Sequence, residues 1–293
     1  MSTIFFKDSK PSTQVLTLLS ALVFFALLSS LTGGALQLLG VDWSRPSAQR
    51  LFQMGAQGLM FLLPAVGVTW LFRGPVVDAL GLRPSGWRTA AAAVALFLLA
   101  LPLFDLLARL NDAWHWSLLP EVEAAFRSQG AQSEALLRPL LEQPGWGAMA
   151  FNLVALAAVP ALCEECFFRG ALQPALARWT KRPHLAVMLT AALFSLAHAD
   201  LFAFLPRFVM GVVLGYFYLS SRSIWPGVCA HFANNALVVV AHALYLRGRT
   251  AVDWSETMPV PLWVTVVCTL AATVLFALAF GRKMPKEGTQ TDV

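Results

Sequence analysis

Residues 160–170 of the chain read Pro-Ala-Leu-Cys-Glu-Glu-Cys-Phe-Phe-Arg-Gly. Two neighbouring carboxylates, Glu164 and Glu165, and the guanidinium of Arg169 therefore stand at the end of an apolar run. Ionised groups in such a place are costly unless they are paired or used in function. The remainder of the chain must supply both an apolar surrounding and polar partners for this stretch.

The composition is that of a protein that crosses a membrane several times. Of the 293 residues, 58% are hydrophobic and 13% are charged, with a mean hydropathy of +0.65, whereas soluble domains carry about 25% charged residues. The net charge of +5 does not indicate nucleic-acid binding, because Lys and Arg are scattered over short loops as topology signals. The first apolar run lacks a convincing cleavage site and is expected to remain as a helix.

A bilayer core requires about 20 apolar residues in helical conformation, and eight segments are candidates for this role. They are approximately 13–31, 51–72, 89–107, 146–168, 185–202, 204–219, 224–246 and 262–280, of which the sixth is short. The predicted fold class is therefore all-α: a polytopic membrane helix bundle of about eight transmembrane helices. We divide it into N-terminal helices with an interfacial connection (1–145), a core with the polar motifs (146–246), and a last helix with a tail (247–293).

An even number of spans places both termini on one side of the membrane. When Arg169 is left out, the side of the termini carries twelve basic residues and the opposite side eight, which predicts cytoplasmic termini. The twelve are Lys7, Lys10, Arg73, Arg83, Arg88, Arg178, Lys181, Arg182, Arg222, Arg282, Lys283 and Lys286, and the eight are Arg45, Arg50, Arg109, Arg127, Arg138, Arg207, Arg247 and Arg249. We predict an integral protein of a bacterial inner or plasma membrane. The connection 111–145 is amphipathic and is interpreted as a plain interfacial loop in preference to a lid or substrate guide.

The cysteines do not form a disulfide framework. They are Cys163, Cys166, Cys229 and Cys268, and all lie in apolar runs, where a free cysteine behaves as a small hydrophobe. The first two have the spacing of a redox or zinc pair, but there is no second pair and the residues between them are two glutamates. Metal binding or redox chemistry is therefore not predicted for them.

The two glutamates are predicted to have different roles. Glu165 and Arg169 are four residues apart on a helix with the acid first, which favours a side-chain ion pair. Glu164 is rotated by about 100° from Glu165 and lacks this partner. We predict that Glu165 is held by Arg169 and that Glu164 is the general base.

Two later spans add polar groups. One contains His198, and the next but one contains His231 and Asn235, which share a helix face because they are four residues apart. Ionisable groups inside a membrane normally face the bundle interior and partner each other, so these residues should converge on Glu164. Helix rise places Glu164 and His198 about 20 Å from the cytoplasmic helix ends and His231 nearer the cytoplasm, which predicts a site reached from that half. Asp200 is expected to end the helix of His198.

These groups allow two mechanisms, between which the residues alone do not choose. In the first, Glu164 deprotonates water with help from a histidine, and donors hold a developing oxyanion. In the second, Glu164, His198 and His231 hold a zinc ion that activates the water. The sequence lacks His-Glu-x-x-His, which excludes a zincin-type helix.

Three motifs in this order resemble the CPBP (ABI) intramembrane proteases, which include the CAAX prenyl endopeptidases and bacteriocin-processing or self-immunity proteins. The motifs are Glu164-Glu165-x-x-x-Arg169, Phe194-x-x-x-His198 and His231-x-x-x-Asn235. The resemblance covers about 146–246 and implies a membrane-embedded peptidase with Glu164, Glu165, His198, His231 and Asn235 as its catalytic set. It implies that Glu164 activates water with His198, that His231 and Asn235 hold the oxyanion or a metal, and that Arg169 and Phe194 shape the site.

The predicted partners are a membrane-associated peptide or protein substrate and the lipid bilayer, without nucleic acid; the oligomeric state stays open, and zinc is the one cofactor considered. A transporter that uses the same buried charges is the alternative from another class, and the absence of an inverted repeat disfavours it. A non-catalytic immunity or scaffold protein is the other alternative. The presence of Glu164, His198 and His231 favours activity over that reading.

Overall fold

The computed structural model describes residues 5–6, 8–114, 120–143, 145–251, 260–281 and 284. Every regular element in these ranges is a helix. The α-helices are α1 (Pro11–Leu38), α2 (Pro46–Gln57), α3 (Leu63–Arg73), α4 (Val76–Ala79), α5 (Trp87–Asp112), α6 (Pro120–Leu141), α7 (Trp146–Asn152), α8 (Val159–Glu165), α9 (Gln173–Thr180), α10 (Pro183–Leu196), α11 (Phe204–Ser221), α12 (Trp225–Leu246) and α13 (Leu262–Ala279). Three π-helical turns, Gly58–Leu62, Leu153–Ala158 and Cys166–Leu172, join consecutive helices, and a 3-10 turn, Leu201–Ala203, precedes α11.

The predicted all-α membrane bundle is confirmed. Seven helical stretches are long and apolar enough to cross a membrane, and α10 is an apolar helix of 14 residues that corresponds to the fifth predicted span. The seven are Pro11–Leu38, Pro46–Arg73, Trp87–Asp112, Trp146–Thr180, Leu201–Ser221, Trp225–Leu246 and Leu262–Ala279. The short span is thus the fifth and not the sixth.

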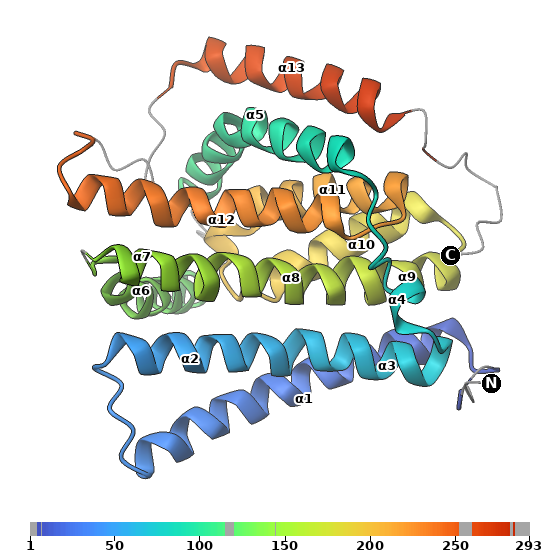
Figure 1. The fold of residues 1–293 in the computed structure, drawn as a ribbon, viewed down its shortest axis with the longest axis horizontal. Helices are drawn as coiled ribbons and strands as arrows, with labels where there is room; N and C mark the ends of the chain where they lie inside the picture. Colours follow the sequence, from blue (N-terminus) through green and yellow to red (C-terminus); the bar gives the residue numbers. More distant parts are fainter. Residues whose placement is uncertain are drawn as a thin grey trace.

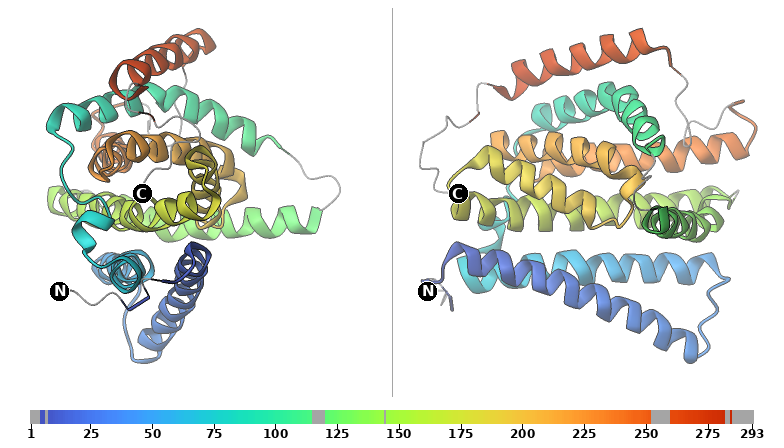
Figure 2. Two further views of the ribbon diagram at one scale, coloured as in Figure 1. Left: turned by 90° about the vertical axis from the view of Figure 1, so that its right-hand side faces the viewer. Right: turned by 180° about the vertical axis from the view of Figure 1, so that it is seen from behind.

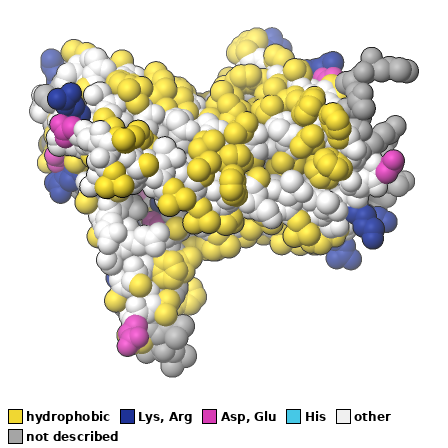
Figure 3. All heavy atoms as spheres, turned by 90° about the horizontal axis from the view of Figure 1, so that it is seen from below, with side chains coloured by type: hydrophobic (Ala, Val, Ile, Leu, Met, Phe, Trp, Pro, Cys, Tyr) yellow, Lys and Arg dark blue, Asp and Glu magenta, His cyan; other side chains and the backbone are white. Residues whose placement is uncertain are grey.

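Most of the long helices run along one common direction (Figure 1). The pair formed by α1 and α2–α3 lies on one face, α7–α9 lies next to it, α10, α11 and α12 follow, and α5 and then α13 lie on the opposite face (Figures 1 and 2). The start of α1 and the end of α13 lie at the same end of the bundle, as an even number of spans requires. Figure 3 shows the side chains of one face: a hydrophobic band in the middle, with Lys and Arg at its two ends.

The chain before Pro64, Pro160 and Pro174 widens into π-helical turns. Each proline is the second residue of an α-helix that directly follows such a turn. Proline lacks the N–H group and clashes with the carbonyl four residues earlier, so the wider turn lets the helix continue. As a result one helical stretch runs from Trp146 to Thr180, and Glu164 and Glu165 lie near its middle.

The connection 111–145 contains α6 and is not the predicted plain loop; residues 115–119 and 144 lie outside the described part. In Figure 1 and in the rear view of Figure 2, α6 is seen nearly end-on, so it crosses the direction of the other long helices at the end away from the termini. Its last turn is anchored by the Leu140 carbonyl, which accepts hydrogen bonds from Arg50 (3.1 Å) and Asn152 (2.7 Å). The guanidinium of Arg127 lies 3.8 Å from the centre of the Phe202 ring. These contacts fix α6 on the bundle.

Candidate functional site

The ion pair predicted within the central motif is present and fully buried. Arg169 donates to Glu165 Oε1 over 2.7 Å, and both side chains have no exposed surface. Arg169 also donates to the Gly211 carbonyl of α11 over 3.1 Å and lies 4.6 Å from the centre of the Phe194 ring of α10. The motif therefore ties the helix that carries it to two neighbouring helices.

His231 of α12 contacts both glutamates. Its Nδ1 lies 3.2 Å from Glu165 Oε1, and its Nε2 lies 3.9 Å from Glu164 Oε2. Because an ionised carboxylate only accepts hydrogen bonds, the contact with Glu165 places a hydrogen on Nδ1. Nε2 is then the ring atom that faces Glu164.

His198, from the turn after α10, also lies near Glu164. Its Nδ1 donates to the Phe194 carbonyl over 2.8 Å, and its Nε2 lies 4.0 Å from Glu164 Oε2. A carbonyl also only accepts, so His198, like His231, presents Nε2 to the carboxylate. Glu164 Oε2 has no hydrogen-bond partner among the described atoms. Each of the two Nε2 atoms therefore lies too far from Glu164 Oε2 for a direct hydrogen bond.

The position of His198 differs from the prediction. Helix α10 ends at Leu196, and Ala199 adopts a left-handed conformation with φ of 53°, so His198 lies in a turn rather than inside a span. Contrary to expectation, Asp200 does not end the helix; it begins the next element, because its side chain accepts from the backbone N–H of Phe202 as the N-cap of the 3-10 turn Leu201–Ala203. The side chain of His198 is 30% exposed, compared with 5% for Glu164 and 4% for His231. The exposed edge of the site therefore lies on the turn after α10, not on the side of the termini from which access was predicted.

The predicted difference in depth between His231 and Glu164 is wrong. His231 is about 9 Å from the start of α12, whereas Glu164 is about 24 Å from the end of α9, yet the two side chains meet. The start of α12 is therefore recessed in the bundle. Residues 81–83 lie over it, because Gly81 O accepts from the N–H of Ile224 (3.0 Å) and Leu82 O accepts from the indole of Trp225 (2.7 Å).

Two residues of the site have no motif that could have predicted them. Gln57, the last residue of α2, donates from Nε2 to Glu164 Oε1 over 3.1 Å. Gly227 of α12 leaves room for Glu165, because a Cβ atom at this position would lie 2.7 Å from Glu165 Oε2. The only signal for Gln57 in the sequence is a polar side chain within an apolar span, and other spans also contain such residues.

The remaining predicted residues take different places. Phe194 is buried at the centre, with its ring 4.9 Å from that of His198 and 5.9 Å from that of His231. Asn235 lies one turn beyond His231 and is half-buried, and its Oδ1 accepts a hydrogen bond from Asn234 over 3.1 Å. The structure describes no contact between Asn235 and either glutamate. Phe194 is thus part of the cluster, and Asn235 borders it.

The predicted zinc ligands are in one place but are spread apart. Ligand atoms about 2.0–2.1 Å from a tetrahedral zinc are roughly 3.4 Å from each other, whereas the two histidine nitrogens lie 3.9 and 4.0 Å from Glu164 Oε2. Both imidazoles would have to move towards the carboxylate to bind the ion. Within the described ranges, no group of three or more His, Cys, Asp and Glu side chains is arranged to hold a metal.

Comparison with known proteins agrees with the resemblance seen in the motifs. The family model described as type II CAAX prenyl endopeptidase, Rce1-like, matches residues 146–237, which include Glu164, His198, His231 and Asn235. Searches of curated proteins and of solved structures found no match. The match confirms the recognition of the CAAX protease family in the core of the chain and supports an intramembrane endopeptidase in general terms.

Proposed function

Proceeding from the match of residues 146–237 to the type II CAAX prenyl endopeptidases, we propose that the protein hydrolyses a peptide bond in a membrane-associated protein or peptide. The observation that carries the proposal is the position of Glu164 Oε2, buried and without a hydrogen-bond partner, at 3.9 and 4.0 Å from two histidine nitrogens. A water molecule between these atoms would contact a base and two imidazoles at once. Such an arrangement serves water activation.

In the proposed reaction, Glu164 takes a proton from the water while the oxygen bonds to the carbonyl carbon of the substrate. Gln57 holds the other oxygen of this carboxylate, so Oε2 stays directed at the water. His198 Nε2 assists as the second proton acceptor. When the C–N bond breaks, the proton returns from this pair to the leaving amine.

The oxyanion would be bound by the α12 motif. A protonated His231 can keep its Nδ1–H on Glu165 and donate Nε2–H to the oxyanion. Asn235 accepts from Asn234 through Oδ1, which leaves its amide hydrogens for the same oxyanion. Arg169 balances the charge of Glu165. The Glu165–Arg169 pair that holds His231 Nδ1–H therefore carries no net charge.

The zinc-dependent mechanism is the competing proposal for the same residues. It requires Glu164, His198 and His231 to close around the ion, which would then supply the activated water. The two mechanisms differ in a directly measurable quantity. If the purified protein contains stoichiometric zinc and loses it when either histidine is replaced, the metal mechanism is selected. If zinc-free protein is fully active, the glutamate–histidine mechanism is selected.

The test uses the purified full chain in detergent and a panel of membrane-tail peptides with and without a prenylated cysteine. We expect Glu164→Gln, His198→Gln and His231→Gln each to lower cleavage by about 10²-fold or more, with unchanged thermal unfolding. Glu134→Gln is the matched control, because Glu134 is an exposed carboxylate on α6. Cleavage by the three variants at the rate of the unmodified protein would overturn the site, and ion flux in liposomes without cleavage would favour a transporter.

A further inference from the structure

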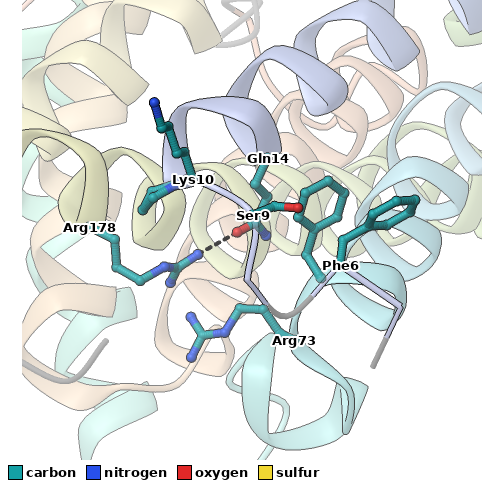
Figure 4. A pocket seen from close by; sticks show the side chains of 8 residues that line it. Phe6, Ser9, Lys10, Gln14, Arg73 and Arg178 are labelled. Carbon is teal, nitrogen blue, oxygen red and sulfur yellow. Dashed lines mark hydrogen bonds between the residues drawn. The ribbon is translucent and has the colours of Figure 1, made fainter. Parts of the chain in front are cut away.

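A cavity of about 340 Å³ lies at the end of the bundle where the termini are. Figure 4 shows the cationic side chains that line it, Lys10, Arg73 and Arg178, and the hydrogen bond of 2.6 Å that Arg178 donates to Gln14 Oε1. Arg73 and Arg178 both have interaction partners within the chain, so the charge of this lining does not indicate a ligand. The turn that follows α10, beside α6 at the other end of the bundle, is a stronger candidate for function because it carries His198.

This turn has a backbone conformation that needs support from its surroundings. Ala199 adopts a φ of 53°, a left-handed conformation that is unfavourable for a residue with a Cβ atom. On the side of α10 the turn is held by the N–H of Ala199, which donates to the Leu196 carbonyl over 2.9 Å. Strained conformations persist only where surrounding contacts maintain them. The segment that follows Ala199 must therefore be held as well.

The side chain of Asn111, in the last turn of α5, holds that segment with both ends of its amide. Its Nδ2 donates to the Leu201 carbonyl over 3.0 Å, and its Oδ1 accepts from the backbone N–H of Leu205 over 2.6 Å. The residue is half-buried and lies 90 residues before Leu201 in the chain. Asn111 thus fixes backbone positions 201 and 205 relative to α5.

One of these hydrogen bonds caps the start of α11. The first N–H groups of a helix lack partners within the helix, and Ala203, at the N-cap position of α11, has no side chain that could accept from them. Asn111 Oδ1 supplies the missing acceptor for Leu205, the second residue of α11. The next residue, Pro206, has no N–H to donate. The cap therefore comes from another helix.

Other contacts join the turn to the two helices that it connects. Asp200 pairs with Arg207 of α11 over 3.0 Å, and Ser195 of α10 donates to the Phe204 carbonyl over 2.8 Å. Asn111 adds hydrogen bonds from α5, whose buried Phe97 belongs to the same hydrophobic cluster as residues of α11. The turn is thereby attached to a well-packed part of the bundle.

We propose that Asn111 is a positioning residue of the peptidase, which holds residues 201–205 on α5 and so keeps His198 Nε2 directed at Glu164. This inference rests on the proposed function, in which His198 Nε2 is the second proton acceptor. That nitrogen lies 4.0 Å from Glu164 Oε2, and a base must be within hydrogen-bond reach of the water that it assists. Because small displacements of a catalytic group slow a reaction strongly, a looser turn would reduce the rate of cleavage.

The first experiment compares Asn111→Leu with the unmodified full chain in the peptide cleavage assay. Leucine has a similar size but makes neither hydrogen bond, so we expect kcat to fall about 10- to 100-fold with little change in KM. Gln132→Leu is the matched control. Gln132 is an exposed amide on α6 whose side chain donates to the Ser128 hydroxyl over 3.3 Å, so this variant should keep full kcat.

A double-mutant cycle tests whether Asn111 acts through His198. Single-turnover cleavage with enzyme in excess measures the rate constants of Asn111→Leu, His198→Gln and the double variant. If Asn111 serves only to position His198, its replacement should cause no further loss once His198 is absent, because groups that act as a unit are not additive. Losses that multiply in the double variant would overturn the positioning role.

Asn111→Asp keeps the proposal testable if Asn111→Leu does not fold. An ionised carboxylate can still accept from Leu205 but cannot donate to the Leu201 carbonyl, so one of the two hydrogen bonds is retained. We expect thermal unfolding near that of the unmodified protein and a fall in kcat of about tenfold. Failure of both variants to fold would limit Asn111 to a role in stability and contradict the proposal.

The outcomes separate this inference from the proposed function. Full kcat of folded Asn111→Leu, together with loss of cleavage in His198→Gln, would overturn the role of Asn111 and leave the peptidase site intact. Equal effects of Asn111→Leu and Gln132→Leu, or a rise in KM alone, would also overturn it. Normal cleavage by His198→Gln would instead overturn the part of His198 in the proposed reaction.

Discussion

At the scale of single residues, Glu164 and Glu165 show how one step along a helix separates two sets of contacts. Glu165 is fully buried and contacts Arg169 and His231, so its charge is held on both sides. Glu164 contacts different groups. Its Oε1 accepts a hydrogen bond from Gln57, and its Oε2 lies near two imidazole nitrogens, both beyond hydrogen-bond distance. The rotation of about 100° between successive residues is the physical cause of this division.

Gln57 is predicted to position the proposed base. Gln57→Leu removes the hydrogen bond to Glu164 Oε1, so the carboxylate loses its fixed orientation, and we expect kcat to fall about 10- to 100-fold with little change in KM. Gln53→Leu is the matched control, one turn earlier on α2 with an exposed side chain, and should leave kcat unchanged. A parallel rise in KM, or an equal effect of both variants, would mean that Gln57 acts through general packing.

The stability of the protein is predicted to fall much further when one partner of the buried ion pair is replaced than when both are replaced. Arg169→Met leaves Glu165 with His231 but without its cationic partner in a site with no exposed surface, and it should destabilise the protein by about 3–5 kcal/mol. The double variant Glu165→Gln with Arg169→Met should recover a large part of this loss, although not activity. Thermal unfolding in detergent checks both statements, and additive losses in the double variant would contradict them.

At the scale of helices, close contacts at glycines determine how the site is assembled. A Cβ atom at Gly211 of α11 would lie 3.0 Å from Ala191 of α10, and one at Gly215 would lie 2.8 Å from Val187. Small residues of this kind let membrane helices approach closely. Gly227 does the same between α12 and α8, and there the contact is with the carboxylate of Glu165 itself.

Gly227→Ala is predicted to damage the site although alanine favours a helix by about 1 kcal/mol over glycine. The added methyl group would displace the Glu165 carboxylate and with it His231, so cleavage should fall and the unfolding midpoint should drop. Gly67→Ala is the control on α3, where an added Cβ meets nothing within 4 Å, and it should be neutral or stabilising. Unchanged cleavage by Gly227→Ala would show that Glu165 can move freely.

At the scale of the whole molecule, the hydrophobic band and the charged ends in Figure 3 are consistent with a bundle that crosses the bilayer along its long axis. The family match and the apolar helices make it an integral membrane protein. The orientation rests on the distribution of basic residues, of which Lys7, Arg282, Lys283 and Lys286 lie outside the described part. Helix α6 marks the end away from the termini (Figure 1).

Cytoplasmic termini are predicted to be visible by cysteine labelling in bacterial cells. In a background without the four natural cysteines, a membrane-impermeant maleimide should label Glu134→Cys on α6 from outside and Arg88→Cys only in inverted vesicles. Both positions are exposed and lie at opposite ends of the bundle. The reverse pattern would invert the orientation, and labelling of both from one side would contradict the crossing of the membrane by α5.

The sequence by itself determined the features that depend on composition or on nearby residues. The apolar runs predicted the membrane bundle, the spacing of Glu165 and Arg169 predicted their ion pair, and the three motifs predicted the family. These predictions succeed because hydrophobicity and helix geometry act over a few residues.

Only the tertiary structure decided which distant groups meet. The recessed start of α12, the turn that carries His198, the crosswise helix α6 and the contact between Gln57 and Glu164 all depend on packing between segments far apart in the chain. Helical periodicity fixes the face on which a side chain lies, whereas the depth and the partner of that side chain follow from how whole helices pack.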